Sequence, residues 1–217
     1  MASITVDIWS DIACPWCFIS KRRFESALEK FAGRAEVEIT FHSFELAPDT
    51  PRDFTGSEID FLVAHKGMAP DRVSEMLAQV TQIAAGEGLN FDFEAVRHAN
   101  TGLAHQLLHF AKTRGRQAEL NERLLSAYFE QGRNVGSVDE LVALAEEVGI
   151  DGAGARAALE TEVYAPAVQE DLDQAKQIGV TAVPFFVFNS KYGVSGAQDE
   201  SAFLEVLQQL ASGDLES

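Results

Sequence analysis

The sequence predicts an α/β protein in which both ends of the chain build one small sheet and a helical segment is inserted between them. The chain opens with a strand, a helix and a second strand, and another β-rich segment follows residue 180. The long stretch between these ends places apolar side chains at helical spacing. Strands at either end alone are too few for a stable sheet. We therefore expect a discontinuous domain, residues 1–50 and 160–217, around a helical insertion at residues 51–159.

The N-terminal segment gives the first strand–helix–strand unit. Residues 4–9 are β-branched and apolar, which predicts a strand. A helix is expected from Pro15 to Phe31, because apolar residues recur at helical spacing and proline is tolerated in a first turn, where its missing N–H costs nothing. Residues 37–44 alternate with a period of two and predict a second strand.

Helices separated by glycine and proline are expected through the middle of the chain. The clearest cover residues 70–85, 101–112, 117–129 and 138–148. Ser137 and Glu140 form a predicted capping box for the last of these. The remaining expected elements are a helix over 162–178 interrupted early by Pro166, an apolar strand over 183–188, a short strand near 192–194 and a helix over 200–210.

Charge and hydropathy exclude several classes of partner. The chain has 17 Lys and Arg against 34 Asp and Glu, a net charge of −17, which repels phosphate backbones and anionic lipid. No apolar run approaches the roughly 20 residues of a transmembrane helix. The stretch from Met1 to Asp7 lacks the basic start of a signal peptide. We expect a cytoplasmic protein that binds neither nucleic acid nor membrane.

The two cysteines, Cys14 and Cys17, are the most informative residues of the chain. A structural zinc site needs four ligands, and His105 and His109 are the one close histidine pair, so no metal is expected unless two subunits share it. A structural disulfide across so short a loop would constrain the unfolded chain little. The spacing therefore favours redox chemistry.

Thiol–disulfide exchange requires a reactive thiolate and a second thiol within reach. At a helix N-terminus the free N–H groups and the helix dipole favour the Cys14 anion. Cys17 lies one turn inside and is expected to be more shielded, so we predict that Cys14 attacks and Cys17 resolves. Pro15 and Trp16, the two residues between the cysteines, supply no imidazolium to stabilise a thiolate, which predicts intermediate acidity of Cys14. Both are expected to meet substrate.

Val183 and Pro184 precede the last apolar strand. A proline cannot donate to a sheet and belongs at a strand start or edge. A cis bond is accessible there, and a trans proline that simply opens the strand is the plainer reading of these residues alone.

Residues 10–25, which contain Cys14-Pro-Trp-Cys17, resemble DsbA-family thiol–disulfide oxidoreductases of the FrnE-like group, in the thioredoxin superfamily. Residues 44–49, 100–105 and 183–198 resemble them too. The resemblance implies a thioredoxin fold with an all-helical insertion, a redox-active cysteine pair, and a cis Val183–Pro184 bond beside it that binds substrate. It implies thiol or disulfide substrates, protein or small-molecule, and no cofactor beyond the redox disulfide, with glutathione as a conceivable co-substrate. We expect a monomer or weak homodimer. Members of this group can carry another cysteine pair near the C-terminus, which this chain lacks.

Three further residues allow two readings each. Asp11 either caps the helix, the favoured reading, or tunes the thiols. His105 is either a structural histidine or part of a groove over the active site. Lys21 is expected to be a solvated charge rather than a modifier of the cysteines.

Alternative functions also remain open. One is a glutathione-dependent isomerase or transferase, as in the related 2-hydroxychromene-2-carboxylate isomerase and kappa-class glutathione transferase families, which typically have serine at the position of Cys14. Another is a non-catalytic adaptor, which would not need two cysteines at this spacing. The intact pair favours the oxidoreductase.

Overall fold

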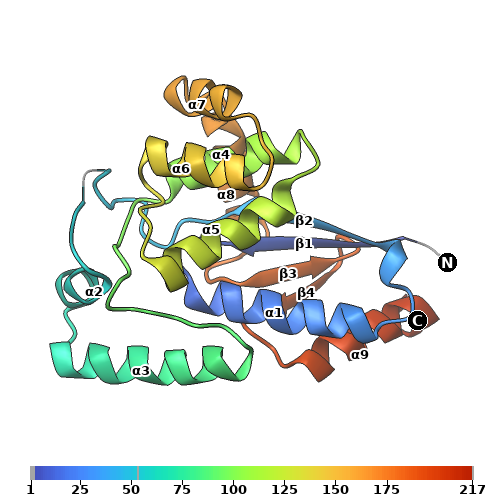
Figure 1. The fold of residues 1–217 in the computed structure, drawn as a ribbon. Coiled ribbons are helices and arrows are strands. Elements are labelled where there is room, and N and C mark those ends of the chain that lie inside the picture. The colour runs from blue at the N-terminus through green and yellow to red at the C-terminus, as the bar shows by residue number, and fades with distance from the viewer. Residues whose placement is uncertain (1–2, 53, 217) are drawn as a thin grey trace.

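A mixed sheet with strand order β2-β1-β3-β4 lies at the centre of the molecule (Figure 1). The structure is a computed structural model and describes residues 3–52 and 54–216, so Met1 and Ala2, used in the expectation about the N-terminus, lie outside the described residues. The strands are β1 (Ile4–Ser10), β2 (Val37–Ser43), β3 (Phe185–Phe188) and β4 (Tyr192–Ser195). β2 is parallel to β1, β3 is antiparallel to β1, and β4 is antiparallel to β3. The two ends of the chain therefore form one sheet, as the sequence predicts.

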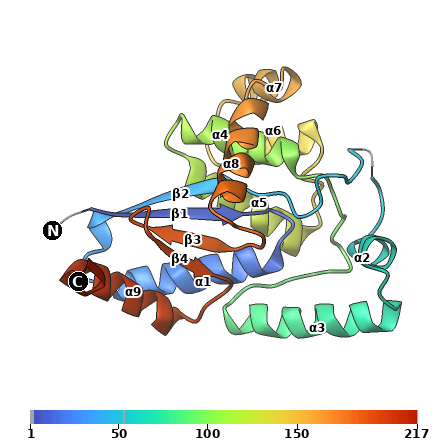
Figure 2. The ribbon, with the colours of Figure 1, turned by 180° about the vertical axis from the view of Figure 1, so that it is seen from behind.

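Helices surround the sheet on both faces. They are α1 (Pro15–Lys30), α2 (Glu58–Lys66), α3 (Pro70–Gly86), α4 (Gly102–Lys112), α5 (Gln117–Gln131), α6 (Val138–Glu147), α7 (Gly152–Glu160), α8 (Ala165–Gln177) and α9 (Glu200–Ser212). Figures 1 and 2 show α1 and α9 along one face of the sheet and the group from α4 to α8 on the other side. The α2–α3 pair extends to one side, next to the end of α1 at which that helix begins.

Two large apolar cores fill these layers. Phe24 of α1, Phe186 of β3 and Phe203 of α9 pack with ring centroids 4.7–5.4 Å apart in the core under the sheet. The helices from α3 to α7 share the second core, which also takes up Ile12, Phe18 and Ile19. The first turns of α1 thus lie where the sheet domain meets the helices. The expected division at residues 50 and 160 stays a prediction.

Local capping differs from the sequence prediction. Ser137 makes no side-chain cap to α6, and the Glu140 carboxylate, its expected partner in the box, is bound by Arg133 at 2.6 Å. A capping box is instead formed by Ser57 and Asp60 at the start of α2, a helix that the periodicity did not identify. Pro166 lies in the first turn of α8 and begins that helix rather than interrupting it.

Candidate active site

The two cysteines lie at the junction of β1 and α1. Cys14 is the N-cap residue of α1, Pro15 follows in the first turn, and the backbone N–H of Cys17 donates to the Cys14 carbonyl at 3.0 Å. Both thiols are free and each residue is 3% exposed, so Cys17 is no more shielded than Cys14. The neighbouring residues Ile12, Phe18 and Ile19 belong to the helical core, so the turn lies at the edge of that core. The position of Cys14 at the helix start agrees with the prediction.

The loop before β3 closes over Cys14. The Cys14 thiol donates to the backbone carbonyl of Val183, with sulfur and oxygen 3.6 Å apart. The Val183–Pro184 peptide bond is cis. The Pro184 carbonyl accepts from the N–H of Gly196 at 2.9 Å, which ties this loop to the segment after β4. The sheet thereby brings the two sequence-predicted segments together.

The environment of Cys14 favours the thiol over the thiolate. The hydrogen bond shared with Cys17 raises the pKa of Cys14 well above its ordinary value, and burial and the Asp11 charge add to the effect. The Cys17 backbone N–H opposes this shift, and the side chain makes no capping hydrogen bond. The hydrogen bond with Cys17, burial and neighbouring negative charge thus act against the acidity that the helix start predicts for Cys14.

Asp11 and His105 form a buried pair beside the cysteines. Asp11 Oδ1 lies 3.2 Å from His105 Nε2, and both residues are 1% exposed. Asp11 Oδ2 accepts from the N–H of Leu46 at 2.8 Å. Burial raises the pKa of Asp11, but the hydrogen bond and charge of His105, the Leu46 N–H and Thr101 outweigh burial and lower it overall. Asp11 does not cap α1, contrary to the favoured reading, because Cys14 is the N-cap residue and Asp11 Oδ1 accepts instead from the N–H of Ala13, before the helix, at 3.4 Å.

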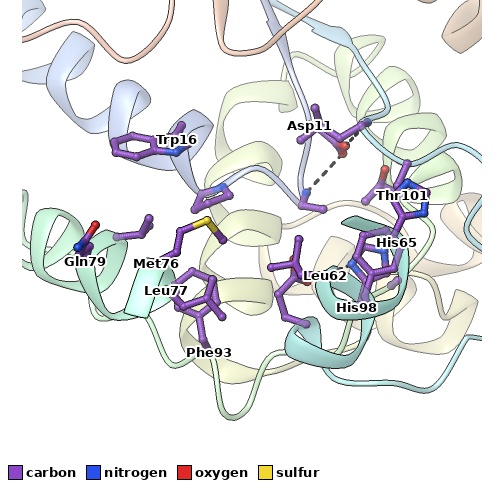
Figure 3. A pocket seen from close by; sticks show the side chains of 18 of the residues that line it. Asp11, Trp16, Leu62, His65, Met76, Leu77, Gln79, Phe93, His98 and Thr101 are labelled. Carbon is purple, nitrogen blue, oxygen red and sulfur yellow. Dashed lines mark hydrogen bonds and ion pairs between the residues drawn. The ribbon is translucent and has the colours of Figure 1, made fainter. Parts of the chain in front are cut away.

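Trp16 projects from the same turn into a pocket of about 530 Å³. The pocket lies between the start of α1, the loop after β2, helices α2 and α3, and the segment before α4. Figure 3 shows Trp16 on one side of it and Leu62 of α2 and Leu77 of α3 across from Trp16. Asp11 and Pro15 line it together with Trp16. His105 is not among its lining residues, and the role of that histidine in a groove over the active site stays a prediction.

Lys21 is buried rather than solvated. Its Nζ contacts Glu25 at 2.6 Å and Glu122 at 2.5 Å, and Glu122 also accepts from Arg22 at 2.7 Å. Since Glu122 belongs to α5, these ion pairs join the helix that carries the cysteines to the helical part of the chain.

A polar cluster that the sequence did not reveal lies on the other side of β1. The Asp171 carboxylate of α8 accepts from His42 Nδ1 at 2.7 Å, from the N–H of Ser43 at 2.7 Å and from His109 Nε2 at 2.9 Å. His42 Nε2 contacts Asp7 at 2.8 Å. Burial lowers the pKa of His42, but the hydrogen bonds to Asp171 and Asp7 outweigh burial and raise it overall. The hydrogen bonds likewise depress the pKa of Asp171 far below its usual range, against the opposing effect of burial.

The described part of the chain offers neither a metal centre nor a membrane-spanning helix. Within residues 3–52 and 54–216, no group of three or more His, Cys, Asp or Glu side chains is placed to hold a metal ion. None of the helices in that part of the chain has the length and apolar character needed to span a bilayer.

Comparison with known proteins gives consistent matches. The model of the DSBA-like thioredoxin domain family matches residues 5–208. The chain is 32% identical over 203 residues to the Bacillus subtilis protein YwbO, covering 93% of this chain and 94% of YwbO. A probable DsbA oxidoreductase from Streptomyces coelicolor has 40% identity and a TM-score of 0.90, with 95% of this chain and 89% of that one covered. A 2-hydroxychromene-2-carboxylate isomerase shares the fold, with a TM-score of 0.72 at 13% identity and 98% of each chain covered.

Proposed function

The chain belongs to the DSBA-like thioredoxin domain family, and from this premise we propose that it exchanges disulfides through Cys14 and Cys17. The observation that carries the proposal is the pairing of the two free thiols at the start of α1, with the Cys14 sulfur against the Val183 carbonyl. Cys14 is the attacking sulfur and Cys17 the resolving one. The FrnE-like character and the cytoplasmic location belong to this proposal.

The reduced pair reacts in two steps. Cys14 loses its proton, and its thiolate attacks one sulfur of a substrate disulfide, whose other sulfur leaves as a thiolate and takes up a proton. Cys17 then loses its proton and attacks the Cys14 sulfur, which breaks the mixed disulfide and releases the second substrate thiolate. Two electrons pass from the cysteine pair to the substrate, and the Cys14–Cys17 disulfide remains. The reverse sequence oxidises a substrate dithiol.

The Val183 carbonyl has a role in the mixed disulfide. In the reduced pair it accepts from the Cys14 thiol. Once Cys14 is joined to substrate that S–H is gone, and the carbonyl is available to a backbone N–H of an extended peptide. This strand-like contact binds main chain without demanding a sequence.

Asp11 and His105 act as positioning residues that tune the pair. The Asp11 carboxylate contributes to the raised pKa of Cys14. His105 Nε2, 3.2 Å from Asp11 Oδ1, holds this carboxylate in place beside the cysteines.

The decisive experiment separates the two sulfurs. Cys17→Ala should accumulate mixed disulfides with a reducible protein such as insulin, because no thiol remains to expel the substrate, whereas Cys14→Ala should accumulate few. Non-reducing electrophoresis and mass spectrometry measure the adducts. Equal adduct yields from both variants would contradict the division of roles.

The alternative is a glutathione-dependent isomerase or transferase, which shares the fold through 2-hydroxychromene-2-carboxylate isomerase. Such an enzyme would need glutathione bound without oxidation of the cysteine pair. The test is isomerase or transferase activity in the presence of reduced glutathione. If the Cys14→Ser variant catalyses such a reaction as well as the native chain does, the alternative is favoured.

A further inference from the structure

Helix α8 packs against β2 and α4 (Figure 2) and leads into the loop that carries Val183. Its buried residues are Val168, Asp171 and Ala175, so a carboxylate stands in the middle of a small apolar face. Valine and alanine bury little apolar area, although such burial is what mainly fixes a helix on its neighbours. The position of α8 therefore depends on the contacts of Asp171.

The Asp171 carboxylate is held by donors from two other elements. His42 Nδ1 and the Ser43 N–H, both of β2, each lie 2.7 Å from it, and His109 Nε2 of α4 lies 2.9 Å from it. Hydrogen bonds to a charged group are stronger than those between neutral groups, and this carboxylate is largely shielded from water. Asp171 thus fixes one turn of α8 against both β2 and α4.

The same turn of α8 also holds Trp9 of β1. The Trp9 indole N–H donates to the backbone carbonyl of Asp171 at 3.1 Å. Trp9 is buried and packs with Ala175 and Val180 in a small apolar cluster, and Val183 packs against this cluster. The residue that binds β2 and α4 through its side chain is therefore joined, through its backbone, to the apolar contacts of the Val183 loop.

The connection from α8 to Val183 is short. The N–H of Val180 donates to the Ala175 carbonyl at 2.8 Å, and the turn between them uses Gly179 with a φ of +78°, a conformation that glycine adopts without strain. Only two residues separate Val180 from Val183. A displacement of α8 would therefore move the Val183 carbonyl, whose oxygen lies 3.6 Å from the Cys14 sulfur.

We propose that Asp171 is a positioning residue of the redox site. By fixing α8 against β2 and α4, it holds the Val183 carbonyl where that group contacts Cys14 and, in the mixed disulfide, the main chain of the substrate. The inference rests on the proposed exchange function and adds to it a residue outside the cysteine turn. Loss of the Asp171 contacts should impair substrates that bind through backbone N–H groups more than substrates that have none.

Two disulfides test this selectivity. One is the dimer of N-acetylated, amidated Ala-Cys-Ala, which offers backbone N–H groups, and the other is bis(2-hydroxyethyl) disulfide, which has no amide. For Asp171→Asn we expect kcat/KM for the peptide, divided by kcat/KM for the small disulfide, to fall about two- to ten-fold, the factor that one hydrogen bond supplies. The loss should lie mainly in KM for the peptide, because the carbonyl contact forms on binding and persists in the transition state.

A second acidic residue of α8 provides the matched control. Asp173 is exposed and accepts from Gln169 Nε2 at 3.0 Å, so Asp173→Asn makes the same chemical change on the outer face of the helix and should leave the ratio unchanged. His42→Gln weakens the Asp171 contacts from the side of β2 and should lower the ratio by a smaller factor, which also tests the inference if Asp171→Asn does not fold. A ratio that stays at the native value in Asp171→Asn and His42→Gln, as a merely structural role predicts, or that falls as far in Asp173→Asn, would overturn the inference.

The Val183 carbonyl can also be observed without turnover. Val183–Pro184 is the one Val-Pro pair of the sequence, so ¹³C-carbonyl valine combined with ¹⁵N proline marks this carbonyl by its carbon–nitrogen coupling in the NMR spectrum. In the reduced native chain its chemical shift reports the hydrogen bond from the Cys14 thiol, and Cys14→Ala gives the shift without that bond. The signal of Asp171→Asn should move towards that of Cys14→Ala, and the signal of Asp173→Asn should stay at the native position.

This measurement separates the inference from the proposed function. If the native chain turns over neither disulfide, the exchange function fails, and the carbonyl signal alone decides whether Asp171 positions the loop. If the native chain exchanges disulfides while the carbonyl signals of Asp171→Asn and His42→Gln stay at the native position, the function stands and the inference is overturned.

Discussion

The sulfur of Cys14 lies 3.6 Å from the carbonyl oxygen of Val183, although the two residues are 169 positions apart in the chain. The antiparallel pairing of β3 with β1 makes this approach possible, because it aligns Trp9 with Phe185 and so places the loop before β3 at the end of β1 where Cys14 follows. Through this contact the Cys14 S–H donates to a backbone carbonyl that the pairing of β3 with β1 holds in place.

The reactivity of Cys14 should depend on Cys17. In the reduced protein, the rate of Cys14 alkylation by iodoacetamide should keep rising above pH 8.5, the ordinary thiol pKa, because Cys17, burial and Asp11 raise the pKa of Cys14. Cys17→Ala removes the first of these causes and should move the midpoint of the rate profile to lower pH. Peptide mass mapping after alkylation over a pH series measures this midpoint, and the Cys14→Ala variant shows which alkylated peptide signal belongs to Cys14. A midpoint that stays in place or rises would contradict this account of the pair.

The Asp11–His105 pair should be strongly coupled in stability. His105→Leu leaves an ionised Asp11 buried without its partner and should lower the free energy of unfolding by about 3–5 kcal/mol. Because the two residues share one interaction, Asp11→Asn combined with His105→Leu should cost less than the sum of the single changes. Urea unfolding measures all three variants.

An exposed ion pair provides the control for that cycle. Asp139 contacts Arg156 at 2.6 Å on the surface, and Asp139→Asn should leave the free energy of unfolding nearly unchanged. Additive effects at Asp11 and His105 would show that the buried contact carries no coupling.

Stability should depend on pH through the His42–Asp171 contact. The raised pKa of His42 stabilises the fold fully below about pH 6.5, its unfolded value, and this contribution is lost as pH rises through the higher folded value. The lowered pKa of Asp171 stabilises the fold fully above about pH 3.9, its unfolded value, and this contribution is lost as pH falls through the lower folded value. The joint contribution is therefore greatest between these limits.

His42→Gln tests this window. The difference in unfolding free energy between the native chain and the variant should be larger at pH 5.5 than at pH 9, and chemical denaturation at both pH values measures it. The effect of the surface variant Asp139→Asn on the free energy of unfolding should be nearly the same at pH 5.5 and at pH 9. A His42 effect that is constant with pH, or larger at pH 9, would contradict a charged His42 in the fold.

Local patterns in the sequence predicted much of the fold. The expected strands at 4–9 and 37–44 agree with β1 and β2 to within one residue at an end, since their apolar and alternating patterns reflect burial. The helix starting at Pro15 and the cap position of Cys14 also agree, because proline and helix ends have local signatures. The short α2 lies between polar residues, and its amphipathic pattern is too weak to distinguish it from a loop.

What the sequence could not predict depends on contacts between distant residues. Asp171 and His42 meet only because α8 packs against β2, and no spacing in the chain signals that approach. The capping box at Ser137 was wrong for the same reason, since Arg133 competes for Glu140. The acidity of Cys14 was also missed, because burial and the facing sulfur are properties of the assembled site.

The wall of the pocket opposite Trp16 comes largely from α2 and α3, whereas the two cysteines lie at the start of α1. The cysteine turn and most of the cavity beside it are thus encoded in separate stretches of the gene. Substitutions between residues 58 and 86 can therefore change the shape of the cavity without altering the cysteine turn or the sheet that supports it.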